Sequence, residues 1–191
     1  REFVADIGAE AERLSRITED LLRLTRLDSG VLEKPVEVEV LPVLEQVMRM
    51  MSLVAKEKQV ELTYTAEPGC TVLATPDELH QVIYNLTDNA VKYTGAGGAV
   101  QVALSRREEN VILTVADNGT GIPEEDLPRI FERFYRVDKA RSRAAGGTGL
   151  GLSIVSDTVK RRGGTVEAAN RPEGGSVFTV RWPAAKGGDA V

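Results

Sequence analysis

Apolar residues near the start of the chain recur at alternating intervals of four and three. Charged residues fill most other positions and Glu10 interrupts the series, whose members are Phe3, Ile7, Leu14, Ile17, Leu21 and Leu24. This heptad spacing predicts one long helix, ended by Gly30 as a C-cap. Two interpretations stay open. The helix is one arm of a hairpin or dimer whose other arm lies upstream, or it packs on its own domain.

Beyond a partly extended connector at residues 31–40, helical and alternating patterns are mixed. Helical spacing predicts helices from Pro42 to about Lys58, over 75–94, near 127–135 and from about Gly149. Period-two alternation predicts strands at 60–67, 71–75, 99–107, 110–117, 165–170 and 176–183, with Glu109 and Asn110 joining the third to the fourth.

Several of these strands are adjacent and antiparallel, which favours an α+β fold. We expect a two-layer α/β sandwich, a mixed sheet covered by helices on one face, with the coiled-coil-like helix at its N-terminus. The domain boundaries expected are a helix at 1–30, a linker at 31–40, a domain at 41–183 and a disordered tail at 184–191.

Composition narrows the class of protein. Apolar residues make up 42% and charged residues 28%, as in ordinary globular domains, and the net charge is −5. This charge gives no reason to expect nucleic acid or an anionic membrane as a partner. Cys70 is the only cysteine and His80 the only histidine, so a disulfide is impossible and a cysteine–histidine nucleophile is disfavoured. No apolar run reaches the ~20 residues that a membrane helix needs.

The predicted helix over 75–94 carries polar residues beside its apolar face. Thr75 and Glu78 form a capping box, with Pro76 at the first helical position. Winding the helix at about 100° per residue gathers Asn85, Asn89 and Lys92 on one edge of the core face, which comprises Leu79, Val82, Ile83, Leu86, Ala90 and Tyr93. His80 falls roughly opposite, on the side shared by Gln81, Tyr84, Thr87 and Asp88. The amides could bond backbone groups, or bind Mg²⁺ with the lysine on phosphate.

Two glycine-containing stretches could hold a ligand. Asp117 ends a strand and is followed by Gly119 and Gly121, which suits either a carboxylate acceptor with close backbone approach or a simple turn. GGTGLGLSIV at residues 146–155 puts glycines before a helix, an arrangement that either binds anions or is a flexible loop. It has neither the P-loop lysine nor the dinucleotide-binding context.

The segment between these stretches is strongly basic. Its basic residues are Arg133, Arg136, Lys139, Arg141 and Arg143. They either form a solvated surface or belong to a mobile lid over a phosphate site. Phe131 and Phe134 are expected to anchor this segment to the body of the domain.

Four stretches in this order, NLTDNAVKYT, DNGTGIP, IFERFYRVD and GTGLGLSIV, resemble the N, G1, F and G2 boxes of bacterial two-component sensor histidine kinases. EAERLSRITEDLLRLTRLDSG resembles the second helix of that family's dimerisation and phosphotransfer hairpin. The resemblance extends over about residues 10–183. It implies the α/β sandwich shared with gyrase, heat-shock chaperone and mismatch-repair ATPases.

The resemblance implies ATP and Mg²⁺ as cofactors, and it assigns residues to them. Asn89 would coordinate the metal, with Asn85 as a second ligand or orienting group. Lys92 and Tyr93 would contact phosphate and nucleotide, and Arg136 the γ-phosphate. Asp117 would accept the adenine amino group. The adenine would be lined by Gly119, Gly121 and Ile122. The phosphates would be bound by the backbone of Thr148, Gly149, Leu150 and Gly151.

The resemblance also implies ATP-dependent protein histidine kinase activity, with the phosphate passed on to an aspartate of a response regulator receiver domain. The family's phosphoacceptor motif, H-E-x-x-x-P, is absent from this sequence. We expect either a chain cut after that helix or an acceptor on another chain, so that this fragment alone has no catalytic acceptor.

The parent protein would form a homodimer through the N-terminal helix. This portion would lie in the cytoplasm, and the parent protein could be anchored in the inner membrane. Two other functions stay open: a degenerate nucleotide- or partner-binding regulatory module without phosphotransfer, and an anti-sigma type serine kinase.

Overall fold

Five strands form a mixed sheet in the computed structural model, which describes residues 2–29, 33–137 and 147–185. In spatial order the strands are β2 (Glu61–Ala66), β4 (Ala99–Arg107), β5 (Asn110–Asp117), β7 (Ser176–Pro183) and β6 (Thr165–Asn170). β2 and β4 are parallel, and the other neighbours are antiparallel. The predicted strands are therefore confirmed, and their pairing makes the sheet mixed.

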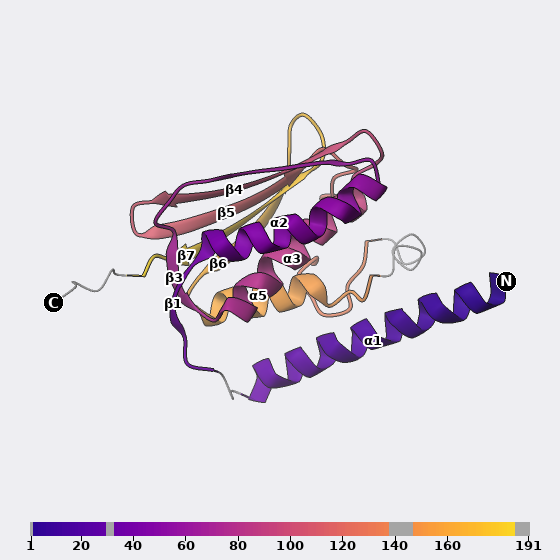
Figure 1. Cartoon of the computed structure of the whole chain (residues 1–191), viewed down its shortest axis with the longest axis horizontal. Helices are drawn as coiled ribbons and strands as arrows, with labels where there is room; N and C mark the ends of the chain where they lie inside the picture. Colours follow the sequence, from indigo (N-terminus) through magenta and orange to yellow (C-terminus); the bar gives the residue numbers. More distant parts are fainter. Residues whose placement is uncertain (1, 30–32, 138–146, 186–191) are drawn as a thin grey trace.

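Three helices cover one face of this sheet, as Figure 1 shows: α2 (Val40–Glu57), α3 (Pro76–Tyr93) and α5 (Gly151–Arg161). Alternate residues of the central strands point at these helices and form the core, including Val111, Leu113 and Val115 of β5 and Phe178, Val180 and Trp182 of β7. The intervening residues are mostly half-buried on the opposite face. The two-layer α+β architecture expected from the sequence is confirmed.

A second, two-stranded sheet pairs β1 (Val36–Glu39) with β3 (Thr71–Ala74). Ala184 forms a bridge with Val72, and the Ala185 N–H donates to the Thr71 carbonyl at 2.8 Å. The expected tail at 184–191 therefore begins too early, because its first two residues still pack against β3. The remaining six residues of that tail lie outside the described part.

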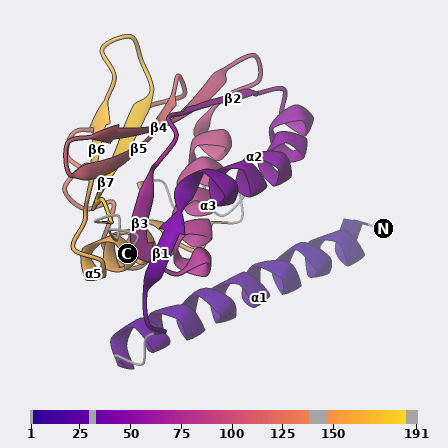
Figure 2. The same ribbon diagram turned by 60° about the vertical axis from the view of Figure 1, so that its left-hand side comes forward.

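Helix α1 (Glu2–Ser29) lies outside the two layers and runs alongside them (Figures 1 and 2). Near its C-terminal end Leu24 and Leu27 pack with Leu150 and Ile154 in a small separate cluster. Two other residues of the heptad series stay exposed, Leu14 at 56% and Leu21 at 42%. One part of the apolar stripe thus packs on the chain's own domain and another part does not.

Three local predictions were wrong. Residues 127–135 form successive turns instead of a helix, and Phe134 has a φ of +64°, which an α-helix cannot contain. The β4–β5 turn consists of Glu108 and Glu109, since Arg107 pairs with Asn110. Helix α2 starts at Val40, two residues before Pro42, which fits in the first turn because its N–H would be unsatisfied there. In the described ranges, we find no helix with the length and apolar content needed to cross a bilayer.

Candidate functional site at the edge of helix α3

The start of α3 is fixed by its predicted capping box. The Thr75 hydroxyl accepts from the Glu78 N–H at 3.2 Å, and the Glu78 carboxylate accepts from the Thr75 N–H at 2.9 Å. Arg162 at the end of α5 forms a largely buried ion pair with the same carboxylate at 2.7 Å. These contacts set where α3 begins, and therefore which residues face the core.

The buried face of α3 is wider than predicted. It includes the expected Leu79, Val82, Ile83, Leu86 and Ala90, and adds Thr87 and Val91. Thr87, which the helical projection put on the opposite side, is fully buried. The reason is that α3 packs on the sheet and also against both α2 and α5. Tyr93 is only half-buried.

Asn85 links α3 to the start of α5. Its Nδ2 donates to the Gly151 carbonyl at 3.1 Å, and its Oδ1 accepts from Gln81 at 3.0 Å. The Asn85 amide is therefore oriented at both ends. Asn89 lies one turn later and is half-buried. Within the described residues its amide makes no hydrogen bond, and Lys92 pairs with Asp88 at 2.5 Å.

Asp117 is the last inward-facing residue of β5, and it is 2% exposed. Its Oδ1 accepts from the backbone N–H of Gly119 at 2.8 Å and of Ser176 at 3.3 Å, and its Oδ2 accepts from the Ser176 hydroxyl at 2.6 Å. Ser176 was not among the candidate residues predicted from the sequence. The signal was present in β7, where Ser176 precedes Phe178, Val180 and Trp182 in the same inward alternation.

The turn after Asp117 lies against the end of α3. A Cβ atom added at Gly119 would come within 2.3 Å of the Tyr93 carbonyl oxygen, so no larger residue fits there. The Thr120 N–H donates to that same oxygen at 3.3 Å. Gly121 has a φ of +70°, a conformation that other residues rarely adopt. The predicted second stretch is thus adjacent to the polar edge of α3.

The start of α5 completes the site. Gly149, at φ +76°, packs against the Phe134 backbone, and Leu150 at the N-cap provides no side-chain cap. The first N–H groups of α5 are therefore available to an anion, and the helix dipole places a partial positive charge at this end of the helix. Thr148 accepts from the Leu150 N–H at 3.2 Å.

The basic segment divides into parts with different environments. Phe131 meets Phe178 edge-on, with ring centroids 6.3 Å apart, so its predicted anchoring is confirmed. The Phe134 side chain is 61% exposed and does not anchor the segment. Arg136 is half-buried, whereas Lys139, Arg141 and Arg143 lie outside the described residues.

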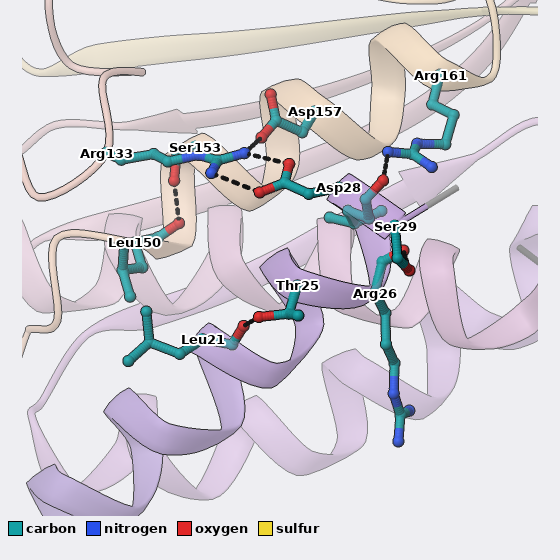
Figure 3. A network of polar contacts seen from close by, with 11 residues as sticks. Leu21, Thr25, Arg26, Asp28, Ser29, Arg133, Leu150, Ser153, Asp157 and Arg161 are labelled. Atoms are coloured by element: carbon teal, nitrogen blue, oxygen red, sulfur yellow. Dashed lines mark hydrogen bonds and ion pairs between the residues drawn. The ribbon is translucent and has the colours of Figure 1, made fainter. Parts of the chain in front are cut away.

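Arg133 bonds to helix α1 and does not lie over the site. Figure 3 shows its guanidinium between Asp28, at 2.9 and 2.8 Å, and Asp157 of α5, at 3.1 Å. The hydrogen bonds from Arg133 lower the pKa of the Asp28 carboxyl. Arg161 also donates to the Leu27 carbonyl, one of the last carbonyl groups of α1, which have no hydrogen-bond partner within the helix.

A second polar contact joins α1 to the phosphate-binding stretch. The Thr148 hydroxyl donates to the Asp20 carboxylate at 2.8 Å. Burial raises the pKa of Asp20, and the Thr148 hydrogen bond and nearby Arg23 and Lys92 offset part of that increase. Helix α1 therefore reaches the start of α5 through an acidic side chain.

We predict that Arg133→Ala loosens the docking of α1. Removing the guanidinium leaves Asp28 and Asp157 facing each other without their shared cation. Amide hydrogen exchange in the last turns of α1 should become several-fold faster, while exchange in α3 should not change.

Arg129→Ala is the matched control, because Arg129 pairs with Glu132 and stacks on Tyr135 in the same segment. Equal exchange of the last turns of α1 in the two variants and the unaltered protein would refute the role of Arg133.

His80 is not part of this site. Its ring stacks on Tyr84, with centroids 6.2 Å apart and planes 10° from parallel. About 140° of helix rotation separates His80 from Asn85, so the histidine faces away from the polar edge.

Comparisons with known proteins identify the family of this chain. Residues 74–186 match the family profile "Histidine kinase-, DNA gyrase B-, and HSP90-like ATPase". The chain is 35% identical over 183 residues to the signal transduction histidine-protein kinase BaeS of Escherichia coli K12, covering 95% of this chain and 39% of BaeS. It is 36% identical over 184 residues to the sensor-like histidine kinase SenX3 of Mycolicibacterium smegmatis, covering 96% of this chain and 48% of SenX3.

Among solved structures, full-length ShkA in complex with AMPPNP matches with a TM-score of 0.81 and 32% identity, over 96% of this chain and 38% of ShkA. The chain thus spans less than half the length of these relatives. The family match covers more than half of the 191 residues and includes α3, the turn after β5 and the start of α5. This chain belongs to the histidine kinase-, DNA gyrase B- and HSP90-like ATPase family.

Proposed function

We propose that this chain is the ATP-binding catalytic portion of a sensor histidine kinase, and that the nucleotide binds along the polar edge of α3. One observation carries the proposal: α3 contacts both other ligand-binding stretches. Asn85 bonds to Gly151 at the start of α5, and the Tyr93 carbonyl receives the Thr120 N–H from the turn after β5. A ligand in this place could reach an amide pair, a buried carboxylate and a helix N-terminus together.

The phosphates and Mg²⁺ fit the side of the site between α3 and α5. Asn89 is the amide that keeps its oxygen available, and amide oxygens are ligands that Mg²⁺ accepts. Since both amides are neutral, most of the charge facing the metal would come from the nucleotide phosphates. The bound metal would neutralise charge that develops on the transferring phosphoryl group.

The contacts of Asn85 favour its role as an orienting group over that of a second metal ligand, because Gly151 and Gln81 already engage both ends of its amide. The N–H groups of Gly149 and Gly151 would face the phosphates, and the Leu150 N–H would join them by exchanging the Thr148 hydroxyl for phosphate. Lys92 and Arg136 would add positive charge, once Lys92 exchanges Asp88 for phosphate.

The adenine ring fits the side near β5. Within the described residues, the Gly119 N–H, the Ser176 N–H and the Ser176 hydroxyl donate hydrogen bonds to the Asp117 carboxylate, which holds it in one orientation as an acceptor. An amino group on a purine could share that acceptor, whereas a carbonyl oxygen at the same ring position would meet a negative charge. Gly119, Gly121, Ile122 and Tyr93 would line the ring.

The reaction proposed is transfer of the γ-phosphoryl group of ATP to an imidazole nitrogen. A nitrogen–phosphorus bond forms, the bond to the β-phosphate oxygen breaks, and ADP leaves. We propose that the acceptor histidine lies outside these 191 residues, that a receiver-domain aspartate then takes the group, and that α1 contributes to a homodimer. This portion would act in the cytoplasm.

A phosphotransfer assay with γ-labelled ATP tests the proposal. This chain alone should gain no acid-labile label, and a version extended to include an H-E-x-x-x-P helix should gain label on its histidine. An extended chain that binds Mg-ATP without becoming labelled would instead support a regulatory module without phosphotransfer.

His80→Ala should leave the affinity for Mg-ADP within about twofold of the unaltered protein. The reason is that His80 stacks on Tyr84, on the side of α3 away from Asn85 and Asn89. Calorimetric titration measures this directly. A large loss of affinity in a variant that unfolds at the same temperature would contradict the position assigned to the nucleotide.

A further inference from the structure

The turn between β6 and β7 holds the segment that follows Asp117. Asn170, the last residue of β6, uses its side chain on the backbone of Ile122. Its Oδ1 accepts from the Ile122 N–H at 2.8 Å, and its Nδ2 donates to the Ile122 carbonyl at 2.6 Å. One carboxamide therefore satisfies both backbone groups of a residue 48 positions earlier, as a neighbouring strand would.

The same turn also contacts the beginning of that segment. Arg171 Nη1 donates to the Asp117 carbonyl at 3.0 Å. Gly175, at φ +83°, packs so closely that an added Cβ would lie 2.1 Å from that carbonyl oxygen. The β6–β7 turn thus holds the segment from Asp117 to Ile122 at both of its ends.

This segment needs such support because its own sequence gives it little. It contains Gly119 and Gly121, whose backbones have the largest conformational freedom in the unfolded or loosened state. Pro123 follows and provides no N–H for a local turn. Among the described contacts, the Asn170 side chain is what satisfies the N–H and carbonyl of Ile122.

We propose that Asn170 is a positioning residue for the nucleotide base. It fixes Ile122 relative to Asp117, so that the apolar contact with the ring and the carboxylate acceptor are present in one geometry before the ligand arrives. Asn170 is exposed and acts through Ile122 rather than on the ligand. The inference rests on the proposed function, because it assumes that a purine binds beside Asp117.

Calorimetric titration of the whole chain with Mg-ADP tests the proposal. Asn170→Ala should raise Kd about tenfold, the factor that corresponds to ordering one backbone residue on binding. Asn170→Asp should act in the same direction, because a carboxylate cannot donate to the Ile122 carbonyl. Binding should stay at one ADP per chain in both variants. Asn110→Ala, at the opposite end of β5, is the control and should leave Kd unchanged.

The stoichiometry separates positioning from a general loss of structure. A variant with an irreversibly misfolded fraction would bind less than one ADP per chain with an unchanged Kd. A variant that unfolds reversibly would raise Kd at full stoichiometry, but the fluorescence of buried Trp182 before titration would then differ from that of the unaltered protein. Either of these results, or an unchanged Kd at full stoichiometry, overturns the role of Asn170 while the nucleotide site stands. Failure of the unaltered chain to bind Mg-ADP would overturn the proposed function and this inference together.

Discussion

Asn89→Ala is expected to weaken Mg-ADP binding by about 100-fold or more, which corresponds to about 2.7 kcal/mol. The amide is half-buried on the edge of α3, and it makes no hydrogen bond within the described part of the chain. The substitution should not lower stability, since alanine is a better helix former than asparagine by a few tenths of a kcal/mol. Titration with ADP in excess Mg²⁺ measures the loss.

The dependence on metal makes this prediction specific. In the presence of a chelator, the Asn89→Ala variant and the unaltered protein should bind ADP equally weakly, because the lost interaction is with the metal. Gln46→Ala is the control, because it deletes an exposed amide on the neighbouring helix α2. A defect of the Asn89 variant that persists without metal would show that the amide contacts the nucleotide or maintains the helix instead.

Asp117→Asn is expected to lower ADP affinity by about 100-fold while leaving the fold intact. The asparagine oxygen can still accept from the N–H groups of Gly119 and Ser176. The Ser176 hydroxyl can rotate to accept from the new amide, so the buried group stays satisfied. What the variant loses is the acceptor for the adenine amino group. A hydrogen bond to a charged partner and the penalty of an unpaired donor together account for this magnitude.

The preference for the base provides the control for this variant. A purine with a carbonyl oxygen at the same ring position could accept from the amide that Asp117→Asn introduces. We therefore expect inosine diphosphate to lose far less affinity than ADP, or to gain it, and the loss of ADP binding should persist without metal. Equal losses for both nucleotides would argue against contact between Asp117 and the base.

Local patterns predicted most of the elements and the positions of several candidate site residues on them. The capping box fixed the start of α3, and helical rotation then placed Asn85 and Asn89 on one edge, where the structure has them. Period-two alternation in β5 correctly ended on Asp117. These predictions depend on residues within a few positions of each other, and such local rules follow from backbone geometry.

The contacts that tie these elements together depended on tertiary packing. Ser176 and Asn170 reach the Asp117 segment only because β7 pairs with β5, and no local pattern states which strands become neighbours. Thr87 is buried because α3 packs on the sheet and against both α2 and α5, and a projection of one helix does not include these neighbours. The contact between Asp20 and Thr148 joins residues 128 positions apart.

The measurement that tests the central claim most directly is a map of backbone amide chemical shifts during titration with Mg-ADP. The nucleotide site proposed here predicts saturable shifts in three places: residues 85–93 of α3, residues 117–122 after β5, and residues 148–151 at the start of α5. Shifts confined to other surfaces, or an absence of saturable shifts at millimolar nucleotide, would contradict it.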